Sequence, residues 1–189
     1  SYSPGQGRVN VIAMDPNDTN TIYLGAPAGG LWKSINGGLT WNVLTDNLPV
    51  LGVTGIAIDP NNSNTIYIAT GDGFGSDTYS VGVLKSIDGG TSFAPTGLSF
   101  TIAQSIRPTK ILMHPTNSNK HWVSTSTGIY MTNNAGASYN RTQTGFVWDI
   151  EMHPTDTNII YASSTEFHKS TNGGLSFNVV NTGLPSRLV

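Results

Sequence analysis

An eight-residue motif recurs four times in this chain, and the repeat constrains the fold more than any single residue does. The motif reads Ser or Thr, any residue, Asn or Asp, two small residues, any residue, Ser or Thr, and an aromatic residue. Its copies, boxes 1 to 4, occupy residues 34–41, 86–93, 132–139 and 170–177. An Asp-Pro or His-Pro turn also recurs once in each repeat, at positions 15, 59, 114 and 153. Periods of roughly 40–55 residues indicate a solenoid, propeller or array.

Each repeat contains short apolar segments separated by turns. In the first repeat these segments are residues 9–14, 21–24, 31–34 and 41–44. No stretch keeps the three-to-four-residue apolar spacing of a helix, so we predict no helix. Four antiparallel strands per repeat are typical of a propeller blade. We therefore predict an all-β propeller, with about four blades of a larger ring at roughly 7–52, 53–107, 108–146 and 147–186.

The residue types of the box suit a tight hairpin turn. An Asn or Asp side chain can accept hydrogen bonds from amides that the turn leaves unpaired. Glycine allows the positive φ that such a turn needs, and the closing aromatic residue can pack between sheets. We predict this structural role for the third residue of each box: Asn36, Asp88, Asn134 and Asn172.

The Asp-Pro and His-Pro turns are interpreted in the same way. Asp side chains in turns bond their own backbone, and His114 and His153 occupy the position that Asp15 and Asp59 hold in the first two repeats. These histidines are therefore predicted to be turn residues rather than metal ligands.

On these motifs the chain resembles the Asp-box, or bacterial neuraminidase, repeat propellers, which include sialidases, sortilin-type receptors and xyloglucan-cleaving glycosidases. Residues 65–72 and 82–90 also resemble large secreted proteins of Bacteroidetes, which often carry a C-terminal domain for type nine secretion. Box 3 departs from the motif with Ala135 and Ala137, and three boxes have Asn in place of Asp. In the enzymes of this group the boxes lie away from the catalytic face. The resemblance therefore implies the fold and leaves the activity open.

Charge and composition exclude several classes of function. Charged residues make up 11% of the chain and the net charge is −2, so neither nucleic-acid binding nor a polybasic membrane patch is expected. No apolar run approaches the length of a membrane span, and there is no cysteine for disulfide or thiol chemistry. Low charge with much Asn, Ser, Thr and Gly is common in secreted bacterial domains, which predicts an extracellular or cell-surface location.

The ends of the sequence suggest further domains as partners. The chain begins without Met, and its last residues, 183–189, resemble residues 47–53, where a new repeat starts. We expect a piece of a longer protein whose other domains accompany this one.

A site is expected on the face opposite the boxes, where the connections vary in length. Long loops on a rigid scaffold are where binding usually occurs. The loop of residues 71–80 combines Asp72 and Asp77 with glycines and aromatic residues, which could suit calcium, a sugar, or packing against the next blade. Phe74 breaks the alternating acidic pattern of a helix-pair calcium loop. We therefore predict no metal site or cofactor, with calcium at Asp72 and Asp77 as the alternative.

Alignment of the repeats brings charged residues to equivalent positions near the axis. Lys110 and Asp149 share one position on the first strands, where a structural ion pair competes with a catalytic role. Glu166 lies at a second equivalent position, at the third strand, where the other repeats have Gly30, Gly82 and Gly128. Exposed aromatic side chains in the loops could stack on glycan rings or hold a peptide. The candidate ligand-binding residues are Phe74, Tyr79, Arg107, Lys110 and Trp148.

Two hypotheses for function follow. The first is a recognition or structural module that binds a glycan or a protein. The alternative is a polysaccharide-degrading glycoside hydrolase, whose acid and base would come from Asp72, Asp149 or Glu166. The resemblance to xyloglucan-cleaving enzymes implies a catalytic Asp after the second strand, a place that Asp72 holds. A sialidase is disfavoured because that activity needs converging arginines, and these are scattered at Arg8, Arg107, Arg141 and Arg187.

Overall fold

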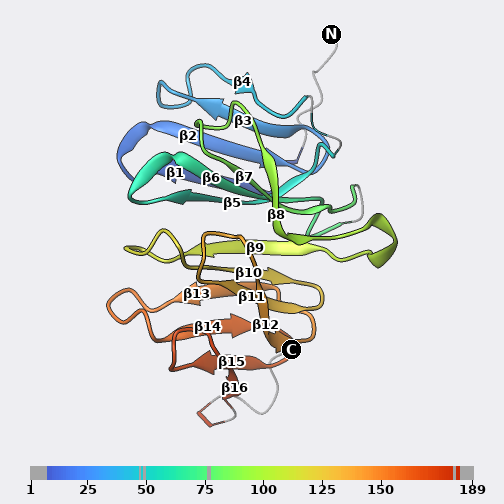
Figure 1. Ribbon diagram of the computed structural model, residues 1–189, viewed down its shortest axis with the longest axis vertical. Helices are drawn as coiled ribbons and strands as arrows, with labels where there is room; N and C mark the ends of the chain where they lie inside the picture. The colour runs from blue at the N-terminus through green and yellow to red at the C-terminus, as the bar shows by residue number, and fades with distance from the viewer. Residues whose placement is uncertain (1–7, 47, 49, 76–77, 181, 184–189) are drawn as a thin grey trace.

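The computed structural model describes residues 8–46, 48, 50–75, 78–180 and 182–183. These residues form four sheets, each of four antiparallel strands in chain order (Figure 1). The predicted all-β architecture of four-stranded blades is confirmed. The described part of the chain has one helical turn, a 3-10 turn at Ile102–Gln104. Asp77 lies outside the described residues.

Each sheet falls within one of the predicted repeat segments, and we call the sheets blades 1 to 4. Blade 1 consists of β1 (Val11–Asp15), β2 (Asp18–Ala26), β3 (Gly30–Ser34) and β4 (Asn42–Val43). Blade 2 consists of β5 (Val53–Asp59), β6 (Asn62–Thr70), β7 (Gly82–Ser86) and β8 (Ala94–Ser99). Blade 3 consists of β9 (Pro108–Met113), β10 (His121–Thr125), β11 (Gly128–Thr132) and β12 (Asn140–Thr144). Blade 4 consists of β13 (Asp149–Met152), β14 (Ile160–Ser163), β15 (Phe167–Ser170) and β16 (Asn178–Val179).

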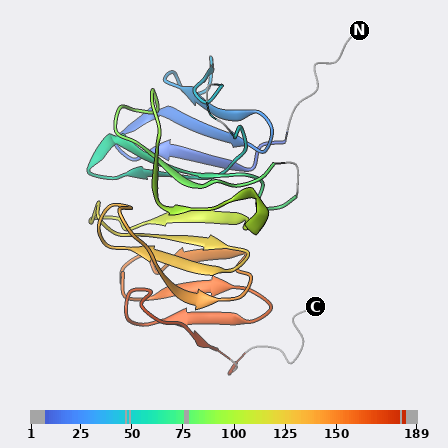
Figure 2. The same ribbon diagram turned by 45° about the vertical axis from the view of Figure 1, so that its right-hand side comes forward.

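The blades lie in a row along the long axis of the molecule (Figures 1 and 2). The first strands of successive blades, β1, β5, β9 and β13, contact one another and form the inner wall. The box hairpins and the β1–β2-type turns lie at one edge of every sheet, so the remaining connections lie at the other edge. None of the described residues forms a helix with the length and apolar character needed to span a bilayer.

The core lies between the sheets. A strand alternates its side chains between two faces, so each blade presents a forward face to the next blade and a rear face to the preceding one. In blade 2, Ile56 and Ile58 pack rearward with Tyr23 of blade 1, whereas Ala57 and Tyr67 pack forward with Val123 of blade 3. A third cluster joins blades 3 and 4 around Trp122, which is fully buried.

All four boxes form the same hydrogen-bond network. In box 1 the Asn36 Oδ1 atom accepts from Ser34 Oγ and from the Thr40 amide, both at 2.9 Å. Ser34 Oγ in turn accepts from the Gly38 amide at 2.9 Å. Equivalent bonds to the third residue occur in the other boxes, at Asp88, Asn134 and Asn172. The amides of the turn are therefore hydrogen-bonded within the box itself and need no partner from another blade.

The Asp-Pro and His-Pro turns are also equivalent. The Asn17 amide donates to Asp15 Oδ1 at 2.9 Å, and the Thr116 amide donates to His114 Nδ1 at 3.3 Å. The Thr155 amide makes the same bond to His153 Nδ1 at 3.4 Å. The predicted turn role of the two histidines is consistent with this geometry, because the ring nitrogen accepts where the carboxylate oxygen accepts in the other repeats.

Box 3 carries a strained residue that yields a stability prediction. Ala135 has φ 55°, where the equivalent Gly37 has φ 69°. Because a left-handed conformation costs a residue with a Cβ atom about 1–2 kcal/mol, partly offset by the stiffer unfolded chain, Ala135→Gly should raise the free energy of unfolding by about 0.5–1 kcal/mol. Gly37→Ala should lower it by a similar amount, since no atom lies closer than 3.9 Å to the added Cβ and only the strain changes. Urea denaturation followed by circular dichroism measures both, and a lower midpoint for Ala135→Gly would contradict the interpretation.

Candidate functional site

A groove of about 450 Å³ runs along the inner wall and is lined by residues at the first strands of all four blades. Three of the residues predicted to bind a ligand meet there. Phe74 comes from the loop after β6, Lys110 from β9, and Trp148 from the residue before β13. Phe74 is 58% exposed and Trp148 is 49% exposed, so both rings face solvent at the groove. The groove therefore joins two accessible aromatic surfaces to a charged patch.

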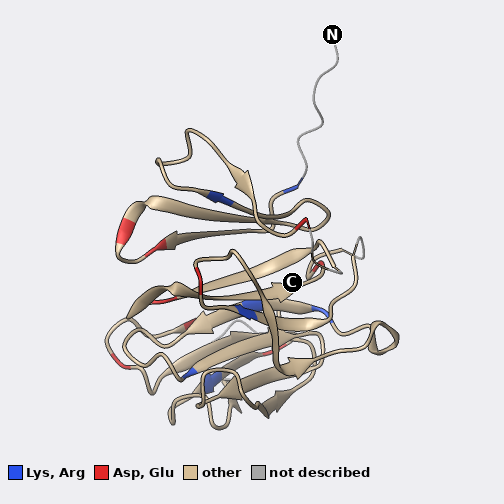
Figure 3. Ribbon diagram, turned by 45° about the horizontal axis from the view of Figure 1, so that its top comes forward, with Lys and Arg blue, Asp and Glu red and all other residues tan. Residues whose placement is uncertain are grey.

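Lys110 is the centre of that charged patch. Its Nζ atom lies 2.9 Å from Asp149 Oδ1 and also contacts Glu151. Burial opposes the charge of Lys110, but hydrogen bonds to Glu151 and Asp149 outweigh it and raise the pKa of the ammonium group. The ion pair that the repeat alignment favours is thus present, with one further carboxylate. Charged residues are otherwise sparse and scattered along the ribbon (Figure 3).

Trp148 packs against Phe146, and Phe146 in turn contacts Arg107. Its ring centroid lies 4.1 Å from that of Phe146. The Arg107 guanidinium lies 5.7 Å from the Phe146 ring centroid and donates to the Gly75 carbonyl at 3.2 Å. Arg107 therefore ties the loop after β6 to the residues that hold Trp148.

The structure separates the five candidate ligand-binding residues into two groups. Tyr79 and Arg107 line a second groove of about 420 Å³, together with Ser80, Ser105 and Ile106. Tyr79 is 60% exposed. Neither residue lines the inner groove, and Arg107 is engaged in holding the loop. The inner groove has two accessible aromatic rings beside its charged groups, whereas the second groove has Tyr79 beside an Arg107 that is already engaged.

Asp72 is fully buried and surrounded by donors. Its carboxylate accepts from the Asn10 side chain at 3.2 Å, from the Phe74 amide at 3.2 Å, and from Arg8. Burial disfavours the charged form, but these hydrogen bonds and one from the Gly75 amide outweigh it and lower the pKa of Asp72. A general base or acid must reach a substrate, so this geometry fits a structural anchor between the entry to blade 1 and the loop of blade 2.

The remaining candidates lie elsewhere. Glu166 is exposed in the turn between β14 and β15, where Ser164 Oγ donates to its carbonyl at 3.1 Å, and it does not line the inner groove. The box residues lie at the opposite edge of the sheets. Within the described part of the chain, no three His, Asp or Glu side chains gather as a metal site. The guanidinium beside Asp72 also makes that carboxylate a poor cation ligand.

Sequence reasoning missed two residues of this region. Glu151 lies two positions after Asp149 on β13, so strand alternation would have placed it on the same face. Asn10 holds the Asp72 carboxylate and lines the groove. Nothing in the sequence marks Asn10 as a site residue, because its contact with Asp72 depends on how the loop after β6 folds back.

Comparison with known proteins finds short sequence matches to xyloglucanases and a likeness of fold to GH74 enzymes and to YCF48. No family model matches the chain. Over 40 residues it is 50% identical to a xyloglucanase of Hypocrea jecorina and 45% identical to xyloglucanase Xgh74A of Acetivibrio thermocellus. Each match covers 21% of this chain and 5% of the relative.

The structural neighbours are similar over almost the whole chain. An ancestral GH74 enzyme matches with a TM-score of 0.77 and 24% identity, over 94% of this chain and 24% of its own. The GH74 xyloglucanase from Xanthomonas campestris matches with a TM-score of 0.73 and 17% identity, over 96% and 31%. YCF48 bound to D1 peptide matches with a TM-score of 0.69 and 17% identity, over 95% and 56%. At these identities the likeness establishes the fold.

The geometry of Asp72 yields a pH-dependent prediction. Its pKa in the folded state lies below the ordinary 3.8, so its contribution to stability is present above pH 3.8 and is lost as the pH falls through the folded value. Asp72→Asn should therefore lower the free energy of unfolding at pH 7 by about 1–3 kcal/mol, and the difference from wild type should shrink in acid. Urea denaturation at pH 7 and pH 3 measures this. Asp46→Asn, at an exposed position of blade 1, is the matched control and should have little effect.

Proposed function

We propose that this chain is a polysaccharide-binding propeller segment derived from a glycoside hydrolase, with the inner groove as its binding surface. The observation that carries the proposal is the placement of Phe74 and Trp148 as exposed rings in one groove. The similarity to GH74 xyloglucanases, in fold and over a short stretch of sequence, supports a β-glucan as the ligand. Further blades would extend the groove around the axis.

Aromatic rings suit sugars because the apolar face of a pyranose stacks on them, while its hydroxyl groups need polar partners nearby. The inner groove offers both. Asn10 and Asp149 line it beside the two rings and supply the polar groups. Thr54 and Thr109 also line it, but they are buried and their hydroxyl groups are hydrogen-bonded within the protein. The contact of Trp148 with Phe146, which Arg107 also contacts, holds the Trp148 ring in place, and this lowers the entropy lost on binding.

The charge of the groove favours an uncharged polysaccharide. Lys110 is shared between Asp149 and Glu151, so its ammonium group is already paired. An acidic sugar would have to displace one carboxylate and would meet the other. A neutral glucan chain meets neither cost.

Hydrolysis is the second candidate function, and the GH74 neighbours favour it. Glycoside hydrolysis needs two carboxyl groups on either side of the scissile bond. Asp149 and Glu151 are the accessible carboxylates beside the groove, with side chains 52% and 62% exposed. They lie on one strand and share Lys110. Asp149 would supply one group, and a blade across the ring would supply the other.

The proposed function also bears on where the protein is located and on which propeller family it belongs to. A xyloglucan-binding protein meets its ligand outside the cell, which supports an extracellular or cell-surface location. The box network supports membership of the Asp-box propellers, and the resemblance to secreted Bacteroidetes proteins supports type nine secretion. A sortilin-like peptide ligand remains the first alternative, since YCF48 bound to D1 peptide has a similar fold.

Ring removal tests the binding function. Trp148→Ala and Phe74→Ala should each weaken binding of soluble xyloglucan roughly tenfold or more, because stacking on an exposed ring is lost while the fold persists. Affinity electrophoresis or titration calorimetry measures the change. Leu39→Ala, at an 84% exposed position in box 1, is the control and should bind as wild type. Equal binding by all four proteins would contradict the assignment.

A separate assay tests hydrolysis. If Asp149 acts on the glycosidic bond, Asp149→Asn should abolish the release of reducing ends from xyloglucan while leaving its binding within a few-fold of wild type. Glu166→Gln, outside the groove, should retain full turnover. Unchanged turnover in Asp149→Asn would remove Asp149 from the chemistry, and binding without any turnover in wild type would leave the binding function alone.

A further inference from the structure

Two of the four boxes contain an Asn-Gly pair, Asn36-Gly37 in box 1 and Asn172-Gly173 in box 4. Such a pair can modify itself without an enzyme. The glycine nitrogen loses its proton to a base and attacks the asparagine Cγ atom, the Cγ–Nδ2 bond breaks, and ammonia leaves a succinimide ring. Water then opens the ring at either carbonyl and yields Asp or isoaspartate. Glycine favours the attack because it has no Cβ atom and adopts many backbone conformations.

The folded box holds the asparagine side chain at both of its polar atoms. In box 1, Asn36 Oδ1 accepts from Ser34 Oγ and from the Thr40 amide, both at 2.9 Å. Asn36 Nδ2 donates to Thr40 Oγ1 at 2.8 Å. Ring closure makes the Cγ atom tetrahedral and moves both polar atoms, so it would have to break these bonds.

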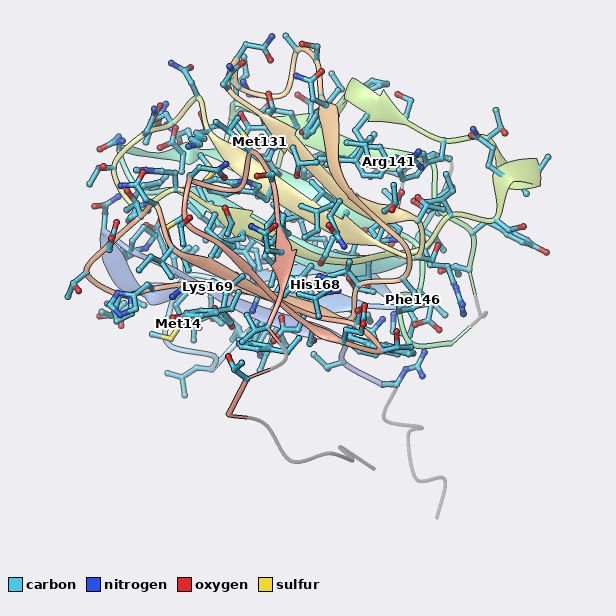
Figure 4. The ribbon with its side chains drawn as sticks, turned by 90° about the horizontal axis from the view of Figure 1, so that it is seen from below. Met14, Met131, Arg141, Phe146, His168 and Lys169 are labelled. Carbon is cyan, nitrogen blue, oxygen red and sulfur yellow. The ribbon has the colours of Figure 1, made fainter. Side chains whose placement is uncertain are left out.

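Box 4 repeats this arrangement on blade 4, the sheet nearest the viewer in Figure 4, where Lys169 marks the strand β15 that leads into the box. Asn172 Oδ1 accepts from Ser170 Oγ at 2.8 Å and from the Ser176 amide at 3.1 Å. Asn172 Nδ2 donates to Ser176 Oγ at 2.9 Å. The two Asn-Gly pairs are therefore held by equivalent bonds.

The attacking nitrogen is engaged as well. The Gly37 amide donates to the Asn20 carbonyl at 2.9 Å, and the Gly173 amide donates to the Asn158 carbonyl at 2.8 Å. A nitrogen that lost its proton would face the carbonyl oxygen that its N–H group now contacts, so this bond stabilises the unreactive form. Gly37 is exposed whereas Gly173 is buried, so the hydrogen bonds, and not burial, are what the two sites share.

We propose that the box hydrogen bonds hold Asn36 and Asn172 unreactive in the folded protein, so that these two deamidation sites react only when their boxes open. The network that shapes each hairpin thus also protects the residue on which it depends. In box 3 the Asn134 side chain is followed by Ala135, whose methyl group hinders the attack. Boxes 1 and 4 are therefore the ones in which this protection matters.

Box 2 shows what the modification would leave behind. Asp88 Oδ1 accepts from Ser86 Oγ at 2.7 Å and from the Ser92 amide at 2.9 Å, and Asp88 Oδ2 accepts from Ser92 Oγ at 2.6 Å. Hydrogen bonds from Ser92 and Ser86 lower the pKa of Asp88 to about 2, so the box accommodates a charged carboxylate. An Asp product fits the box, whereas isoaspartate adds a carbon atom to the backbone of a tight turn.

Peptide mapping by mass spectrometry tests the proposal on the protein held at one temperature and mildly alkaline pH, with and without urea. Asn36 and Asn172 should deamidate at least about tenfold more slowly in the folded protein than in urea, because only the molecules with an open box can react. A synthetic peptide of residues 34–41, measured in both buffers, corrects for any effect of urea on the chemistry itself. Equal corrected rates in the folded and the unfolded protein would overturn the proposal.

Substitutions within one box test the bonds themselves. Thr40→Val removes the acceptor of Asn36 Nδ2 and leaves box 4 unchanged, so Asn36 should deamidate roughly threefold or more faster in the folded variant. Asn172 in the same molecule is the control and should keep its wild-type rate. Ser176→Ala should make the reciprocal change and speed Asn172 alone. No acceleration in either variant would contradict the role of these bonds, and equal acceleration at both sites would do so too, because reactivity would then follow global unfolding.

Discussion

Every part of this structure depends on apolar packing between neighbouring sheets. A four-stranded blade has side chains on both faces, so it cannot bury its apolar surface alone and needs a sheet on each side. Ile56 and Ile58 are buried only because blade 1 covers them, and Ile12 and Met14 are exposed at the same positions where no described sheet does. The box hairpins serve this packing, since their amides are paired internally and the turns can meet the next blade without unsatisfied donors.

The first two junctions between blades share their polar contacts, and the third differs. Between blades 1 and 2, Ser63 Oγ donates to Asp15 Oδ1 at 2.7 Å, and between blades 2 and 3, Ser118 Oγ donates to Asp59 Oδ1 at the same distance. Blade 3 has His114 where a carboxylate would accept, and Met131 at the position that Lys33 and Lys85 hold in blades 1 and 2. Its junction instead buries Trp122, with Lys120 Nζ 5.0 Å from the ring centroid. Burial and the charge of Lys120 lower the pKa of His114, so the ring favours the neutral form that accepts the turn amide.

The fold was predictable from sequence because its determinants are local. Gly-Gly turns, Asn or Asp acceptors and short apolar strands act within a few residues of one another, so the motif at residues 34–41 specifies its own hairpin. The site was predictable only in part. Lys110 and Asp149 emerged from the repeat alignment because the strands keep register. Asp72 looked accessible in sequence, but its burial depends on Arg8 and Asn10, which are distant in the chain and meet it only after two blades have packed.

The inner wall explains why the proposed binding surface lies in one region of so regular a scaffold. Positions between sheets must stay apolar and of suitable size, as the buried Ile66, Val83 and Ile129 do. The first-strand position nearest the groove is less uniform, and it holds Val11, Gly55, Lys110 and Asp149 in the four repeats. A Cβ atom at Gly55 would lie 3.3 Å from Ile111, whereas the Lys110 and Asp149 side chains reach solvent. A repeat fold can therefore acquire a binding surface at the blades where this position opens to the axis, while the boxes and the packing between sheets keep the blades together.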